Sequence, residues 1–160
     1  RMAMERSSYE TLEGHGSPTV RQLSVFLENR VGQLLRLTQV IERRKIKILA
    51  LSVSDSVDFA VVRLLFDNPD EAAQVLREEN FAISVADVLV VKLPRGDRGL
   101  LTIFSALLSA EVNISYAYPL LPAWFGPAIA LSVDNIEIAA ETLRRRKFVV
   151  LTEPDLHRGA

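Results

Sequence analysis

Two short segments of the chain combine glycine with charged side chains of both signs. The first covers residues 28–34 and the second covers residues 93–101. Each places a glycine, Gly32 or Gly99, beside the expected start of a helix. Free backbone N–H groups and the helix dipole favour an anion at such a position, and glycine leaves the backbone open to it. The two segments are therefore candidate sites for a small molecule that carries a carboxylate.

Charged residues in these segments suit the rest of an amino-acid zwitterion. Arg30 or Arg98 can pair with a carboxylate, and Glu28 or Asp97 can bind an ammonium group. An alternative interpretation needs no ligand, because Asn29 can cap the helix and the glycines can serve close packing. The sequence leaves both interpretations open.

The chemistry that most enzymes use is missing from the globular part of the chain. The two histidines, His15 and His157, lie near the termini, and there is no cysteine. A Cys/His nucleophile or a zinc site in the core is therefore excluded. No glycine-rich phosphate motif occurs. We predict no catalytic residue, no cofactor and no metal, and hence no enzyme.

The net charge and the hydropathy of the chain limit which classes of partner we expect it to bind. The 19 basic and 20 acidic residues give a net charge of −1, which provides no attraction to nucleic acid or to an anionic membrane. No apolar run is long enough to span a bilayer. With the lack of cysteine, this predicts a cytoplasmic protein. Hydrophobic residues make up 49% of the chain, which suits buried sheets and an oligomer, and we predict a homodimer.

An internal repeat organises the elements that hold these segments. The stretch 67–77 recurs at 134–144 with Asp, Asn, Ala, Ala, Leu and Arg at matching positions. The same offset of 67 residues relates Phe81 to Phe148 and Gly32 to Gly99. Distant blocks that share one offset indicate a duplication.

Hydrophobic periodicity predicts the same order, β-α-β-β-α-β, in each copy. In the first copy we expect Asn68 to cap the second helix. We expect the first helix to bury one stripe of side chains, formed by Val31, Leu34, Leu35, Thr38 and Ile41. In the first copy the predicted strands are 21–27, 46–53, 59–66 and 82–85, and the predicted helices begin at 32 and 69. In the second copy the predicted strands are 88–93, 112–120, 127–133 and 148–151, and the predicted helices begin at 99 and 136.

This order is that of an α+β fold built from two tandem ferredoxin-like modules. Each is expected to be an antiparallel sheet with helices on one face. We assign a flexible N-terminal leader to residues 1–19, the modules to 20–87 and 88–152, and a C-terminal tail to 153–160.

The stretch Glu28–Leu34, followed by a helix and the strand Ile46–Ser52, resembles an ACT domain. The second copy matches through Gly99–Leu101 and Val112–Ile114. The family often has proline before the glycine, where this chain has Val31 and Arg98. The resemblance covers about Val20 to Leu151 and is closest to small stand-alone tandem ACT proteins.

The resemblance implies a non-enzymatic regulatory role in which a small ligand, such as an amino acid, binds between ACT units. The first loop of one unit would face the second strand of its neighbour. With Glu28 from the first segment, the implied ligand contacts are Asn29, Arg30, Val31, Gly32, Gln33, Leu34, Asp97, Arg98, Gly99, Leu100 and Leu101 in the loops, and Ala50, Ser52, Tyr116 and Tyr118 on the strands. The two tyrosines alternate along one strand and share a face, so plain sheet packing is an equal alternative.

Three hypotheses follow. The first is a regulatory protein that binds an amino acid and responds allosterically. The second is an interaction module, or a regulatory subunit of an amino-acid biosynthetic enzyme, without a metabolite site of its own. The third is a small enzyme on a ferredoxin-like scaffold, and the lack of core histidine weighs against it.

Overall fold

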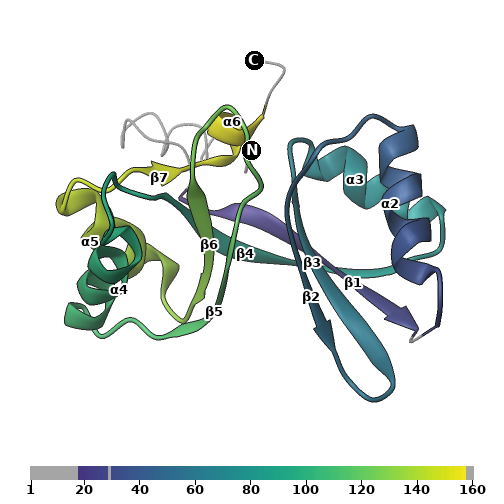
Figure 1. Cartoon of the computed structure of the whole chain (residues 1–160), viewed down its shortest axis with the longest axis horizontal. Coiled ribbons are helices and arrows are strands. Elements are labelled where there is room, and N and C mark those ends of the chain that lie inside the picture. Colours follow the sequence, from purple (N-terminus) through teal and green to yellow (C-terminus); the bar gives the residue numbers. More distant parts are fainter. Residues whose placement is uncertain (1–17, 29, 158–160) are drawn as a thin grey trace, which may run out of the picture.

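The computed structural model describes residues 18–28 and 30–157 and contains one continuous antiparallel sheet (Figure 1). The hydrogen-bonded order is β2-β3-β1-β4-β6-β5, and β7 also pairs with β4. The strands are β1 (Val20–Glu28), β2 (Ile48–Asp55), β3 (Phe59–Phe66), β4 (Ala82–Lys92), β5 (Ile114–Pro119), β6 (Ala128–Val133) and β7 (Val150–Leu151).

Two pairs of helices cover the outside of this sheet at its two ends (Figure 1). The helices are α2 (Gln33–Arg43), α3 (Pro69–Glu78), α4 (Gly99–Ser109) and α5 (Ile136–Arg145), followed by the single turn α6 (Glu153–Leu156). The predicted cap at Asn68 is confirmed, since its side chain accepts a hydrogen bond from the backbone N–H of Glu71. Asn135, one repeat later, caps α5 in the same way through the N–H of Ile138.

The strand β4 belongs to both halves of the sheet. Its first part, Ala82–Val88, pairs with β1, and its second part, Leu89–Lys92, pairs with β6. The two strands predicted at 82–85 and 88–93 are therefore one strand, because Asp87 continues the pairing opposite Arg21 instead of ending it. The module boundary that we assign at 87/88 falls inside this strand.

The two faces of the sheet bury different cores. On the outer face, Leu23, Val25 and Leu64 pack under α2 and α3, and Leu89, Leu107 and Leu131 pack with α4 and α5. On the inner face, strands of the two modules pack against each other and form what we call the inter-sheet core. It consists of Val20, Leu49, Ala50, Leu65, Val88, Val90, Tyr118, Leu120, Phe125, Ala128, Ala130, Leu151 and Leu156.

The sheet curls until its two outermost strands meet. Ala50 in β2 bridges to Leu120 just after β5, and the N–H of Leu121 donates to the carbonyl oxygen of Leu49 at 2.8 Å. The inner face is thereby closed around its apolar residues, while the helices remain outside (Figure 1).

One predicted detail is wrong. The buried stripe of α2 is Leu37, Val40 and Ile41, so Ile41 is the one member of the predicted stripe that is buried, and Leu34 and Leu35 are exposed. The tail assigned to 153–160 contains α6, whose Leu156 lies in the inter-sheet core. Most of the predicted leader, residues 1–17, lies outside the described residues.

Candidate functional site

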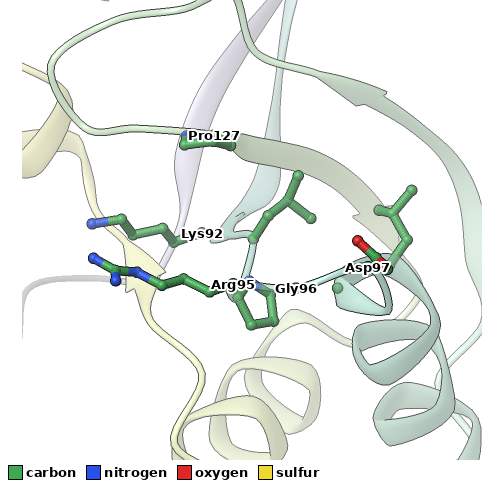
Figure 2. Close-up of a pocket in the computed structure, with 9 residues that line it drawn as sticks. Lys92, Arg95, Gly96, Asp97 and Pro127 are labelled. Carbon is green, nitrogen blue, oxygen red and sulfur yellow. The ribbon is translucent and has the colours of Figure 1, made fainter.

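A pocket of about 580 Å³ lies where β4 ends and α4 begins (Figure 2). It forms because the chain leaves the sheet at Lys92 and must cross to the helix, with the loop before β6 as the opposite wall. The lining residues are Lys92, Leu93, Pro94, Arg95, Gly96, Asp97, Gly99, Leu100 and Pro127.

The charges around this pocket are separated by sign. The side chains of Lys92 and Arg95 extend in the same direction, and Asp97 lies on the other side, by the start of α4 (Figure 2). Neither cation forms an ion pair with any residue that the structure describes. The pocket therefore offers two cationic groups and one carboxylate to a ligand.

The N-terminus of α4 opens on this pocket without an internal cap. Arg98 is the N-cap residue, and its side chain makes no capping hydrogen bond. The N–H groups of Gly99, Leu100 and Leu101 belong to the first turn, which has no acceptors within the helix. A side-chain Cβ at Gly99 would lie 3.2 Å from the carbonyl oxygen of Pro94, so any larger residue would force the Pro94 backbone to shift by a few tenths of an ångström.

The equivalent loop of the first module is built differently. Gly32 is itself the N-cap of α2, with φ of 89°, and α2 also lacks a side-chain cap. Arg30 is bound by Glu28 at 2.9 Å on the surface, so the two predicted ligand charges neutralise each other. Val31 is fully exposed and Leu34 partly so. Gln33 begins α2, and its N–H donates to the carbonyl oxygen of Arg30. The predicted contact Asn29 lies outside the described residues.

The structure does not bring the two loops together within one chain. Phe26, near the end of β1, pairs with Ala82 at the beginning of β4, whereas the pocket loop follows Lys92 at the other end. A strand of 11 residues spans about 33 Å at about 3.3 Å per residue. A single ligand therefore cannot contact both loops of one chain.

The four predicted strand contacts lie on the inner face, away from both loops. Ala50 and Tyr118 are buried in the inter-sheet core, Tyr116 packs against it, and Ser52 pairs with Arg63 in the sheet. Tyr116 and Tyr118 do share a face, with ring centroids 6.4 Å apart.

A polar network that the sequence analysis missed holds these tyrosines. The fully buried Gln22 donates to the hydroxyl of Tyr116 at 2.9 Å and accepts from the hydroxyl of Tyr118 at 2.5 Å. Burial raises the pKa of Tyr118. Burial also acts to raise the pKa of Tyr116, but hydrogen bonds with Gln22 and Ser132 and the charge of Arg63, 4.0 Å above the ring, outweigh it and lower that pKa. The arrangement joins the two modules through side chains of β1 and β5.

Several pocket residues were not predicted as contacts. They are Lys92, Leu93, Pro94, Arg95, Gly96 and Pro127. The sequence does carry a signal for the first of them, since Lys92 interrupts the apolar run Val88–Leu93 directly before the loop. Pro127 comes from another part of the chain, and only the fold places it opposite.

The described part of the chain contains neither a helix long and apolar enough to cross a membrane nor a group of three or more metal-ligating side chains.

Solved structures show the same architecture. Protein BT0572 from Bacteroides thetaiotaomicron is 28% identical with a TM-score of 0.80, over 88% of this chain and 97% of that one. The regulatory subunit of aspartate kinase from Thermus thermophilus is 15% identical with a TM-score of 0.56, over 80% of this chain and 90% of that one. The corresponding subunit from Thermus flavus is 13% identical with a TM-score of 0.54, over 81% and 93%.

No curated protein sequence matches the chain significantly. The family model described as an ACT domain pair matches residues 18–159. That match covers both repeats, including the two glycine loops and the strand that they share. The chain therefore belongs to the ACT domain pair family.

Proposed function

We propose that this ACT domain pair is a non-enzymatic regulatory protein that binds a small ligand, an amino acid by its chemistry, in the pocket of the second module. The observation that carries the proposal is the uncapped N-terminus of α4, which opens on a pocket with Lys92, Arg95 and Asp97 at its rim. The free N–H groups and the cations suit a carboxylate, and Asp97 suits an ammonium group.

A second copy of the chain completes the proposal. The first helix of each module exposes apolar side chains, with Leu35 on α2 and Leu101, Phe104 and Leu108 on α4. Leu108 is 76% exposed, and α4 contains no charged residue. Exposed apolar stripes of this kind mark protein interfaces. We propose a homodimer that covers them and brings loop residues of one unit toward a strand of its neighbour.

We also propose a regulated partner enzyme. Two of the similar structures are regulatory subunits of aspartate kinase. Their likeness supports a role beside an amino-acid biosynthetic enzyme, in the cytoplasm, with residues 20–87 and 88–152 as the two regulatory modules. Binding of a ligand at an interface would then be coupled to association.

A thermal-shift screen against the twenty amino acids tests the proposal. A ligand at 100 times its dissociation constant adds about 2.7 kcal/mol to the free energy of unfolding, which raises the melting temperature by several degrees. We expect Arg95→Ala to abolish the shift. Arg30→Ala is the matched control, because it removes an arginine of the other loop that is already paired with Glu28.

A flat screen on folded protein would contradict ligand binding. If such a protein is nevertheless a dimer by light scattering, the exposed stripe of α4 would favour the interaction module instead. A shift that survives Arg95→Ala but disappears with Arg30→Ala would move the site to the first module.

A further inference from the structure

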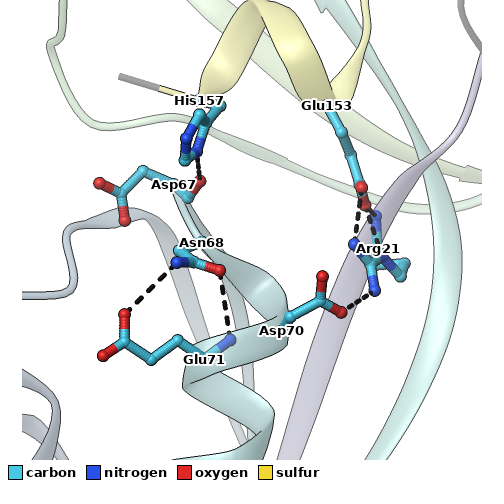
Figure 3. Close-up of polar contacts among 7 residues, drawn as sticks. All are labelled: Arg21, Asp67, Asn68, Asp70, Glu71, Glu153 and His157. Atoms are coloured by element: carbon cyan, nitrogen blue, oxygen red, sulfur yellow. Dashed lines mark hydrogen bonds and ion pairs between the residues drawn. The ribbon is translucent and has the colours of Figure 1, made fainter. Parts of the chain in front are cut away.

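The end of the chain returns to the first module. After β7, residues Thr152–His157, which we call the strap, form the single turn α6 over the start of β1 and of α3 (Figure 3). Thr152 and Asp155 cap this turn reciprocally, with the N–H of Thr152 donating to Asp155 at 2.8 Å. The strap is therefore a defined turn.

Arg21 and Glu153 make the main contact between the strap and the first module. One carboxylate oxygen of Glu153 accepts from the backbone N–H of Arg21 at 2.7 Å and from its Nε at 2.8 Å, and the other accepts from Nη2 at 2.9 Å. This paired geometry is among the strongest that an ion pair adopts. It connects residues separated by 132 positions in the sequence.

One further polar contact joins the strap directly to the segment before α3, and Arg21 links the strap indirectly to α3 itself. Arg21 also donates from Nη1 to Asp70 at 2.6 Å, so one guanidinium holds a carboxylate of the strap and a carboxylate of α3. The ring Nδ1 of His157 donates to the carbonyl oxygen of Asp67 at 2.9 Å (Figure 3).

The strap buries few apolar side chains against the first module. Its one buried apolar side chain is Leu156, and Arg21 remains 38% and Glu153 26% exposed at their side chains. Ion pairs that solvent reaches weaken as the ionic strength rises. By contrast, the modules themselves are joined by the shared strand β4 and by the apolar inter-sheet core.

We propose that the strap is an ionic latch, which docks on the first module through Glu153 and undocks as a unit while the two modules remain folded. Undocking would uncover the Arg21 guanidinium and the end of the inter-sheet core at Leu156. The latch does not depend on the ligand pocket described above.

The single tryptophan of the chain reports on this latch. The indole N–H of Trp124 donates to the carbonyl oxygen of Asp155 in the strap at 3.3 Å. The experiment is acrylamide quenching of Trp124 fluorescence in the wild type, in Glu153→Gln and in Glu141→Gln. The last is the matched control, because Glu141 pairs with Arg145 on α5, away from the strap. Circular dichroism verifies that each variant is folded.

We expect Glu153→Gln at least to double the quenching constant at low salt, and Glu141→Gln to leave it unchanged. The wild-type constant should rise toward the Glu153→Gln value between about 0.05 and 1 M sodium chloride, as the Debye length falls to about 3 Å. Equal quenching of the wild type and Glu153→Gln at low salt would overturn the proposal. So would a wild-type constant that does not change with salt, a measurement that needs no variant.

Discussion

The two modules share a helical framework and differ in the loop before the first helix. Asn68 and Asn135 cap the second helices identically, one repeat apart. In contrast, Gly32 takes a left-handed conformation at the N-cap of α2, whereas Gly99 is already inside α4 and lies close against the backbone of Pro94. The duplicated chain has kept the residues that form the framework and changed those that surround the candidate sites.

Paired substitutions in the two cores should have the largest effect. Leu76 and Leu143 are equivalent and fully buried, so Leu76→Ala and Leu143→Ala should each lower the free energy of unfolding by about 2–5 kcal/mol. Because β4 and the inter-sheet core are shared, we expect one transition in both variants. Chemical denaturation followed by circular dichroism and by Trp124 fluorescence measures this.

Val57→Ala, at an exposed position between β2 and β3, is the control and should change the free energy of unfolding by less than about 0.5 kcal/mol. If the two signals separate in Leu76→Ala, the modules unfold independently and the shared strand does not couple them.

Alanine substitutions at Gly32 and Gly99 should have different effects, the first on backbone strain and the second on the shape of the pocket. Gly32→Ala should cost about 1–2 kcal/mol because alanine is strained at a φ of 89°, while the second pocket stays intact. Gly99→Ala must displace the Pro94 backbone, which is a wall of that pocket. We therefore expect a ligand-induced thermal shift to persist in Gly32→Ala and to be lost in Gly99→Ala. The opposite pattern would place the ligand in the first module.

Removing either helix cap should lower the free energy of unfolding by the same amount. Asn68→Ala and Asn135→Ala each remove one hydrogen bond to the first turn and should each cost about 1 kcal/mol. Thermal denaturation of both variants tests this, with Asn113→Ala, an exposed position, as the control. A cost confined to one module would show that the caps are not equivalent.

The smallest expected effect is the pH dependence of the stability that the Arg21–Asp70 ion pair contributes. The hydrogen bond from Arg21 lowers the pKa of Asp70, so the carboxylate stabilises the fold at pH values above its ordinary pKa of about 4. This contribution is lost as the pH falls through the lowered value. Since Asp70 is 80% exposed at its side chain, it should not exceed about 1 kcal/mol.

The difference in unfolding free energy between the wild type and Asp70→Asn measures the effect of pH. It should be present at neutral pH and vanish in acid, and Glu137→Gln, at the equivalent position on α5, serves as the control. A difference that is the same at both pH values would contradict the assignment to this ion pair.

Local patterns predicted the elements well because they are set by neighbours in the sequence. Phe59–Phe66 was predicted with the bounds that the structure gives, and the cap at Asn68 was correct. The stripe of α2 was wrong because the helix carries two apolar rows, and the sequence does not distinguish the row that faces its own core from the row containing Leu34 and Leu35, which faces outward.

Long-range features could not be read in the same way. Gln22 bonds to tyrosines 94 and 96 residues away, and nothing near it in the sequence indicates those partners. The pocket could be predicted from the sequence only in part. Its glycine loop was visible, whereas Pro127 reaches it only through the antiparallel pairing of β4 and β6.

The contact between the strap and β1 also orders events during synthesis. Arg21 leaves the ribosome 132 residues before its partner Glu153, and the strand β7 also follows long after β1. The first module can complete its four-stranded half once β4 has emerged, while the inner face stays uncovered until the second half is translated. A nascent chain therefore exposes Leu49, Leu65 and Val88 until the second half has been made, the stage at which chaperones would have most to protect.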